Sequence, residues 1–279
     1  MIDQIIKLLP NLVQNPKIEP TELHFHKKTC LLVQEGALLF GTKQRAIVPF
    51  IKEIIKQNNK ITTILYVCGY NGSGAAAIAY AAYICKLKCK IIIAYKTEEK
   101  LSIYHDSKGK ASLNALSAEI SYTKTYGEAR IKADAIMKKS KKGTIFYPAM
   151  GFNTELWRNI LSKQLRHAAS FIKNDPDKTI WVTAGSGSIA MSLHLAFPAV
   201  TLCLYLSGGD KYQKIIREWA ADKPNVILIP QPLHLEDNPQ VPYPTVKDYD
   251  DYIYPYFSQY AADGDIIWNI ASDDINIPV

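Results

Sequence analysis

Short apolar runs alternate with helix-like segments along most of this 279-residue chain, and this alternation strongly limits the possible folds. The run Ile61–Cys68 is almost continuously apolar, as a strand buried on both faces of a parallel sheet requires. Further strands are expected at 90–95, 144–148, 179–183, 200–206, 226–229 and 265–270. Helices are expected at 46–55, 75–85, 111–118, 128–139, 153–172, 189–195, 211–221 and 250–262. This order predicts an α/β protein with mainly parallel sheets and helices on both faces.

Composition narrows the class of protein further. Lysine and arginine outnumber aspartate and glutamate by 33 to 26, and the resulting net charge of +7 suits anionic ligands, including nucleic acid. There is no run of about 18 apolar residues, which argues against a membrane span. The first ten residues lack the features of a signal peptide. Five cysteines, an odd number in apolar contexts, favour reduced thiols in the cytoplasm, and Cys85 and Cys89 lack the partners of a zinc site, so no metal is expected.

Lys43 lies where a predicted extended segment, 31–40, meets the helix expected from residue 46. Its neighbours are partly apolar, so its ammonium should be poorly solvated and its pKa lowered. A lysine of that kind can act as a base or form a Schiff base. The alternative is a solvated lysine in a surface loop.

Two glycine-rich turns stand between a predicted strand and a predicted helix, at 69–74 and at 185–188. Backbone N–H groups at such a helix N-terminus bind phosphate or carboxylate, and glycine lets the backbone approach the ligand. Either turn alone is a weak signal, because many α/β loops contain two glycines. The two turns together with Lys43 predict a site for an anionic ligand.

A dinucleotide site is the main alternative for the second turn. Residues 185–190 match the pattern G-x-G-x-x-A after a strand, and Asp210 follows the next strand, near where a ribose-binding acid is expected. This interpretation predicts an NAD-dependent oxidoreductase, but it leaves Lys43 and the turn at 69–74 unexplained. A phosphate-binding P-loop is excluded at Gly36–Lys43, because the spacing is one residue too long and Gln44 replaces the required Ser or Thr.

The order of these segments resembles that of the fold type II pyridoxal-phosphate enzymes, the group of tryptophan synthase β, threonine synthase and aminocyclopropane-carboxylate deaminase. Residues 40–45 resemble the segment whose lysine carries the cofactor, and 71–76 resemble the segment over the cofactor ring. Residues 183–188 resemble the phosphate cup, and 265–272 resemble the last strand with the polar partner of the pyridine nitrogen. The resemblance covers residues 30–275. It implies a two-lobed, three-layer αβα fold, with a larger cofactor-binding lobe of residues 1–44 plus 144–279 and a smaller lobe of 45–143.

The resemblance also implies a role for each matched residue. Lys43 would hold pyridoxal 5'-phosphate as a Schiff base and move protons. The other cofactor contacts would come from Tyr70, Asn71, Gly185, Ser186, Gly187, Ser188 and Ser272. Substrate contacts would come from Ser73, Gly74 and Gly151, although a plain helix connector is the alternative for 150–153. In the family the pyridine partner often lies two residues after the asparagine of the last strand. That position is Ala271 here, so Ser272 and Asn269 are the polar candidates.

The implied activity is elimination, deamination or β-replacement on an amino acid or a related small-molecule amine. A variant places the amine on a modified nucleic acid, which the positive charge favours. An α/β binding protein that keeps only the phosphate cup is a third possibility, beside the oxidoreductase. A homodimer is compatible with the resemblance.

Overall fold

The computed structural model describes residues 12–70, 74–105, 108–230, 240–246 and 249–272, together with positions 3, 5, 7 and 9. The chain forms two compact units, residues 1–14 with 46–152 and residues 15–45 with 153–279. The division into lobes 1–44 plus 144–279 and 45–143 stays a prediction. The sequence also predicts a short amphipathic helix at 2–9, most of which lies outside the described residues. No helix in the described part of the chain is long and apolar enough to cross a membrane.

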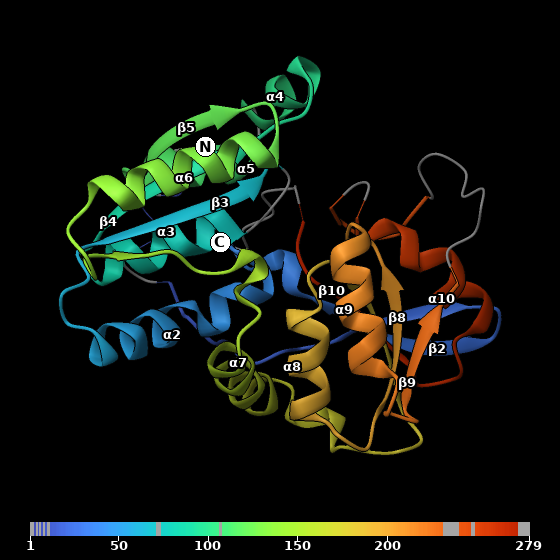
Figure 1. Cartoon of the computed structure of the whole chain (residues 1–279). Helices are drawn as coiled ribbons and strands as arrows, with labels where there is room; N and C mark the ends of the chain where they lie inside the picture. Colours follow the sequence, from blue (N-terminus) through green and yellow to red (C-terminus); the bar gives the residue numbers. More distant parts are fainter. Residues whose placement is uncertain are drawn as a thin grey trace. The chain divides into compact units, whose positions relative to one another are not determined.

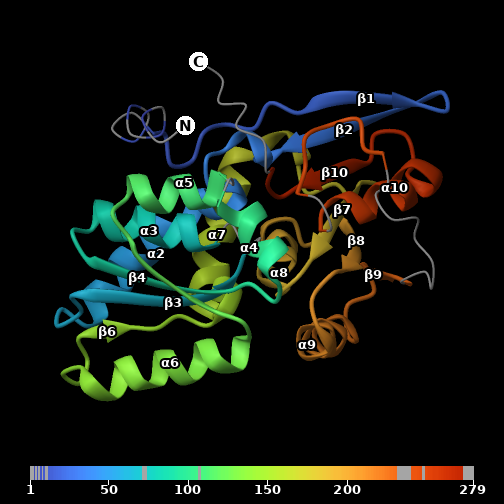
Figure 2. The same cartoon turned by 90° about the horizontal axis from the view of Figure 1, so that it is seen from above.

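The unit of 15–45 and 153–279 contains a six-stranded sheet, which Figures 1 and 2 show from two sides. Its strands lie in the order β1 (Thr21–Phe25), β2 (Lys28–Gln34), β10 (Ile266–Asn269), β7 (Thr179–Ala184), β8 (Thr201–Leu206) and β9 (Val226–Ile229). Every neighbouring pair is parallel except the β1–β2 hairpin. The central strands therefore end at one edge of the sheet, where ligand-binding turns of α/β proteins usually lie.

Helices cover both faces of this sheet (Figure 2). One face carries α7 (Glu155–Ala168), α8 (Ser188–Ala196) and α9 (Asp210–Ala220), and the other carries α10 (Tyr254–Tyr260). Alternate strand residues such as Trp181 and Tyr205 point toward α10 and pack with its Phe257. Thr154 caps α7 by accepting a hydrogen bond from the Trp157 N–H at 3.2 Å. A hydroxyl at this position satisfies an N–H that has no partner within the helix.

The unit of 1–14 and 46–152 is built on a four-stranded, fully parallel sheet. Its order is β5 (Glu119–Thr123), β4 (Lys88–Ala94), β3 (Thr63–Gly69) and β6 (Ile145–Phe146). Its helices are α2 (Gln44–Gln57, of which 46–57 lie in this unit), α3 (Gly74–Ile84), α4 (Glu98–His105), α5 (Lys108–Ala115) and α6 (Tyr126–Lys139). Figure 2 shows α3 and α5 on one face and α6 on the other. The small residues Ala129 and Ala133 bring α6 close to Leu65, Val67 and Ile92 of the sheet.

The two sheets with helices on both faces confirm the predicted α/β class with mainly parallel strands. Three local predictions were wrong. Residues 31–40 are extended only to Gln34, after which the short 3₁₀ turns η2 (Glu35–Ala37) and η3 (Gly41–Lys43) follow. The helix expected at 153–172 ends at Ala168. The helix expected at 250–262 is divided into η6 (Asp251–Ile253) and α10, because Pro255 fits only the first turn of a helix.

A buried ion pair joins the ends of the segment 35–45. Arg45 Nε and Nη2 donate to the Glu35 carboxylate at 2.7 and 2.6 Å, and both side chains are 2 % exposed. Arg45 Nη1 also donates to Asn15 Oδ1 and to the Pro16 carbonyl, each at 2.7 Å. Two hydrogen bonds therefore join the Arg45 guanidinium to the Glu35 carboxylate, and Nη1 has acceptors of its own. A buried ion pair is stable only when its charges and its other donors are bound in this way.

Replacing Arg45 with methionine should destabilise this unit by about 3 to 5 kcal/mol, because the Glu35 carboxylate is then left buried without its partner. Urea unfolding followed by tryptophan fluorescence measures this directly, since Trp157, Trp181, Trp219 and Trp268 all lie in residues 153–279. The double change Arg45→Met with Glu35→Leu should recover most of the loss, and Arg217→Met, at an exposed arginine, should change little. A loss below about 1 kcal/mol for Arg45→Met would contradict the paired, buried description.

Candidate active site

Lys43 ends a short turn that is anchored on the last strand of the six-stranded sheet. The Thr42 N–H donates to the Ile270 carbonyl at 3.0 Å, just beyond the end of β10. Gly41 has φ of +60°, and a Cβ at this position would lie 2.6 Å from the same carbonyl oxygen. Glycine is therefore required where the turn meets the strand, and the backbone at Lys43 is fixed as a consequence.

The amino group of Lys43 lies in a poorly solvated environment together with the Asp250 carboxyl group. Burial lowers the pKa of Lys43 from 10.5 to about 8, and the charge of Asp250 opposes that shift. Burial likewise raises the pKa of Asp250 from 3.8 to about 8, against the Ala271 N–H and the charge of Lys43. A lysine with a pKa near 8 is partly neutral close to physiological pH, and the neutral amine is the nucleophile.

The two oxygens of Asp250 differ in their hydrogen bonding. Oδ2 accepts from the Ala271 N–H at 3.3 Å, just after β10. Oδ1 is buried and has no hydrogen-bonding partner in the described part of the chain. A buried oxygen without a partner is costly, and it commonly marks a place where a ligand binds.

The turn 185–188 joins β7 to α8. Gly187 has φ of +80°, and a Cβ there would lie 2.7 Å from Ile216 Cγ1, so glycine is required at this position as well. The hydroxyls of Ser186 and Ser188 lie 3.2 Å apart. Because α8 begins at Ser188, the N–H groups of its first turn have no carbonyl one turn earlier to bind. Together these features form a site that suits an anion.

Asn153, two residues before α7, holds this turn in place and is itself held by Arg158 of α7. Asn153 Nδ2 donates to the Ser186 carbonyl at 3.1 Å, and Arg158 Nη1 donates to Asn153 Oδ1 at 2.8 Å. The Ser186 carbonyl is thereby held by the Asn153 amide. This leaves the Ser186 N–H and hydroxyl as the groups of that residue that can meet an anion.

Tyr249 and Asp250, adjacent in sequence, connect the turn with Lys43. The Gly185 N–H donates to the Tyr249 hydroxyl oxygen at 3.0 Å. Asp250 binds Ala271 and Thr42 binds Ile270, which brings Asp250 and Lys43 to the same end of β10, where the charge of Asp250 acts on Lys43. Burial, reinforced by the charge of Asp250, raises the pKa of Tyr249 well above its usual value, so the phenol stays neutral. The structure therefore brings Lys43 and the turn 185–188 into one site through a dipeptide that sequence reasoning missed.

Ser272 and Asn269 both lie near this site, in different roles. Asn269 is 2 % exposed, and its Nδ2 donates to Gln34 Oε1 at 2.7 Å and to the Pro244 carbonyl at 2.8 Å. Its Oδ1 accepts from Thr245 at 3.0 Å, so Asn269 is a structural link between β10, β2 and residues 244–245. Ser272 is half-buried against Gly36, where a Cβ would lie 2.6 Å from Ser272 Cβ.

The other predicted residues belong to the unit of 1–14 and 46–152. Asn71 and Ser73 lie outside the described residues. Gly74 begins α3, and a Cβ there would lie 2.7 Å from the hydroxyl of Tyr66, which also accepts from the Gly151 N–H at 3.3 Å. Tyr70 is half-buried, with Lys100 Nζ 5.7 Å from its ring centre. Gly74 and Gly151 are thus brought together on one tyrosine, a contact that the sequence did not predict.

The structure gives little support to a dinucleotide site at 185–190, because the expected ribose partner has a simpler explanation. Asp210, the expected ribose partner, is exposed and is the first residue of α9. An acid in the first turn stabilises a helix without any ligand. Within the described residues, no group of three His, Cys, Asp or Glu side chains has the geometry to hold a metal ion.

Because the charge of Asp250 raises the pKa of Lys43, replacing Asp250 with asparagine should lower that pKa below about 8. The amide oxygen can still accept from Ala271. The measurement is the pH dependence of Lys43 modification by an amine-specific reagent, with the peptide quantified by mass spectrometry. The modification rate should rise with pH and reach half its maximum near pH 8 in the wild type, at lower pH in Asp250→Asn, and unchanged in the exposed control Asp210→Asn. An unchanged or higher midpoint in Asp250→Asn would refute the pairing.

Comparison with known proteins identifies solved structures with a similar fold. No family model and no curated protein matches the sequence. An aminocyclopropane-carboxylate (ACC) deaminase homologue superposes with a TM-score of 0.70 at 12% identity, covering 97% of this chain and 95% of that one. A hydrogen sulfide-producing enzyme from Fusobacterium nucleatum gives 0.63 at 12% identity over 97% and 98%. A pyridoxal 5'-phosphate-dependent aspartate racemase gives 0.61 at 11% identity over 99% and 95%. The chain therefore has the fold of the fold type II pyridoxal-phosphate enzymes.

Proposed function

We propose that this protein is a pyridoxal-phosphate-dependent enzyme that acts on an amino acid or a related small amine by elimination, deamination or β-replacement. The observation that carries the proposal is the position of Lys43 in a chain with this fold: Thr42 and Asp250 both bind the chain just after β10, and Tyr249, next to Asp250, binds the glycine turn 185–188. Deaminases, lyases and racemases among the structural relatives support the reaction class.

The residues present fit this cofactor on two observations. Asp250 Oδ1 is a buried acceptor for which the described residues offer no hydrogen-bonding partner, as expected where a ligand donor binds. The turn 185–188 approaches its neighbours so closely that Cβ atoms at Gly185 and Gly187 would lie 2.5 and 2.7 Å from side-chain atoms. In this proposal the N–H groups of the turn and the Ser186 and Ser188 hydroxyls bind the phosphate, which the first turn of α8 favours electrostatically.

Lys43 is the residue that attaches the cofactor and moves protons. When bound, pyridoxal phosphate supplies an aldehyde for amines and a ring that withdraws electrons from the substrate carbon. Lys43 Nζ contributes a neutral amine near pH 8, because burial disfavours its charged form. Released from the cofactor, the same amine would take a proton from the substrate carbon or return one to it, and the backbone anchored at Thr42 limits how far it moves.

The ring nitrogen has two candidate partners in this proposal. Ser272, predicted from the sequence, follows β10 and offers a hydroxyl. Asp250 offers a carboxyl oxygen without a hydrogen-bonding partner among the described residues, and its pKa is near 8, so it can hold a shared proton in that range. A carboxylate partner keeps the nitrogen protonated and strengthens electron withdrawal, whereas a hydroxyl partner favours a neutral ring.

The residues of the other unit keep their predicted roles in the proposal. Asn71 would bind the ring hydroxyl, Tyr70 would stack beside the ring, and Ser73 with Gly74 would receive the substrate carboxylate. Gly151 would belong to the substrate loop, and the tyrosine contact that it shares with Gly74 supports a joint role. These residues determine which amine is accepted, whereas Lys43 and the turn 185–188 determine the cofactor.

Incubation with pyridoxal phosphate should turn the protein yellow, and borohydride should then leave a pyridoxyl group on Lys43. Lys43→Ala should still take up the cofactor, more weakly, because the turn 185–188 is intact. Its turnover of a substrate amine should fall by at least about two to four powers of ten. Absorption spectra and peptide mass spectrometry measure attachment, and equilibrium dialysis measures uptake. The exposed Lys211→Ala is the matched control and should behave as the wild type.

Two outcomes would contradict the proposal. One is a label on another lysine, or no label, in protein whose tryptophan fluorescence shows that it is folded. The other is tight binding of NADH without binding of pyridoxal phosphate, which would favour the oxidoreductase interpretation of residues 185–190.

A further inference from the structure

Positive charge is concentrated in one part of the chain. Residues 46–152 contain 17 lysines and arginines against seven acids, whereas the remainder contains 16 against 19. The net charge of +7 therefore comes from the part that builds the four-stranded sheet, not from the part with Lys43. A local excess of this size needs an explanation beyond solubility.

The lysines gather where the chain enters the strands of this sheet. All four strands are parallel, so the connections α2–β3, α3–β4 and α6–β6 lie at the same edge, the amino edge. Exposed lysines on these connections and at the adjoining helix ends are Lys56, Lys60, Lys86, Lys88, Lys138, Lys139, Lys141 and Lys142. We call these eight residues the lysine edge. In Figure 1 the helix ends and loops of this edge lie at the far left.

Hydrogen bonds hold the three connections side by side. The Lys88 N–H donates to the Thr62 carbonyl and the Thr62 N–H to the Thr144 carbonyl, both at 2.9 Å. Asn58 Nδ2 donates to the Gly143 carbonyl at 3.0 Å. Since neighbouring strands lie about 5 Å apart, the lysines form one continuous surface. The hydrogen bonds between the three connections thus hold the backbone on which these lysines lie.

Simple structural roles explain only part of the lysine edge. Lys56, Lys138 and Lys139 end helices, where cations stabilise the carbonyl end. Lys60, Lys86, Lys88, Lys141 and Lys142 lie at or beyond the helix ends, and no ion pair of theirs is found within the described residues. The nearby acid Glu119 is held by Lys90 at 2.8 Å. Five cations kept close together without acids repel one another, unless an anion binds across them.

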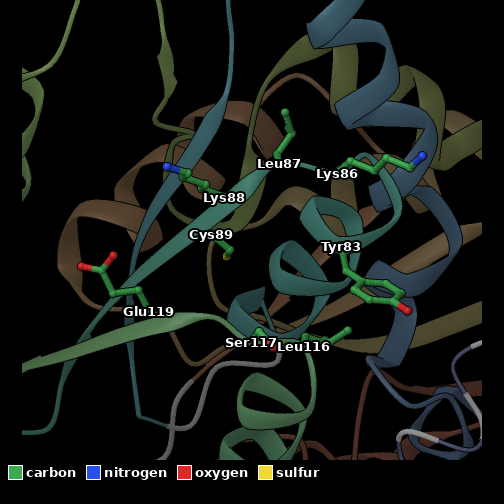
Figure 3. Close-up of a pocket in the computed structure, with 8 residues that line it drawn as sticks. All are labelled: Tyr83, Lys86, Leu87, Lys88, Cys89, Leu116, Ser117 and Glu119. Carbon is green, nitrogen blue, oxygen red and sulfur yellow. The ribbon is translucent and has the colours of Figure 1, made fainter.

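A cavity of about 400 Å³ opens within the same edge (Figure 3). Its walls include Tyr83, which is 54% exposed, and the aliphatic side chains of Leu87 and Leu116. Figure 3 shows Lys86 and Lys88 extending in opposite directions beside it. The cavity also borders Ser117 and Glu119, whose charge is paired with Lys90. A cavity with apolar walls, an exposed aromatic ring and two neighbouring cations has features that bind a base and the adjoining phosphates of a single strand.

We propose that the lysine edge and its cavity bind single-stranded nucleic acid. The phosphates lie along the lysines, and a base stacks on Tyr83. An anionic membrane fits less well, because the three connections expose no large apolar side chain other than Tyr83 within the described residues. The site is independent of Lys43 and of the turn 185–188, so it goes beyond the proposed enzyme activity.

The test measures binding of the full chain to a fluorescent uridine oligomer of about 20 nucleotides by anisotropy, over a range of salt concentrations. The triple variant Lys88→Gln, Lys141→Gln, Lys142→Gln should bind at least tenfold more weakly. Its plot of log affinity against log salt should be less steep by about 2, since each neutralised single-strand phosphate contributes about 0.7. The triple control Lys163→Gln, Lys211→Gln, Lys214→Gln removes the same charge from exposed sites outside residues 46–152 and should bind as the wild type.

Tyr83→Leu separates stacking from charge. It should weaken binding about fivefold or more with an unchanged salt dependence, because stacking of one base contributes that much. The proposal is overturned if the wild type does not bind, or if both triple variants lose affinity equally, which would indicate net charge alone. It is also overturned if phosphatidylserine vesicles, polyglutamate or a DNA duplex bind more tightly than the single strand.

Discussion

The buried ion pair between Glu35 and Arg45 is the interaction on which the candidate active site depends. It joins the two ends of a segment that contains Lys43, and the same Arg45 binds Asn15 and Pro16. Between these ends the chain makes two short 3₁₀ turns that pass against the end of β10, with Gly36 close to Ser272 and Gly41 close to Ile270. Because both ends and the middle are fixed, these backbone constraints position Lys43.

The poorly solvated position of Lys43 costs free energy of folding, but it favours the neutral amine, which is the reactive form. Burial disfavours the charged forms of both Lys43 and Asp250, which is why the two pKa values move toward each other. A fold selected only for stability would place apolar residues there, since buried charges rarely add stability. The Tyr249 hydroxyl adds a neutral contact to Gly185, so one dipeptide links the lysine with the anion-binding turn. The lysine edge of the four-stranded sheet has the opposite character, because its eight lysines are exposed.

The sequence was sufficient to predict the strands and helices that local residue patterns determine. Apolar runs located β3, β7 and β8, and the glycines of 185–188 were predicted to open α8. It did not predict contacts between distant residues. Asp250 follows a proline-rich stretch and is ordinary by composition, and only folding places it against Ala271 and Lys43. Glu35 continues an apolar run and was expected to be extended, but pairing with Arg45 turns the chain at that point. The length of the helix expected at 250–262 was overestimated, because the prediction did not take into account that Pro255 must lie in the first turn of a helix.

Hydrogen–deuterium exchange with and without pyridoxal phosphate, read by mass spectrometry on peptides, tests the cofactor site most directly because it needs no substrate. Binding should slow exchange in two separate peptides, one containing residues 41–45 and one containing 185–192, since the first follows the attached lysine and the second supplies the phosphate-binding N–H groups. Peptides of the lysine edge, such as 138–144, should be unchanged. Slower exchange confined to other parts of the chain, or no change at saturating cofactor, would contradict a cofactor site built from Lys43 and the turn 185–188.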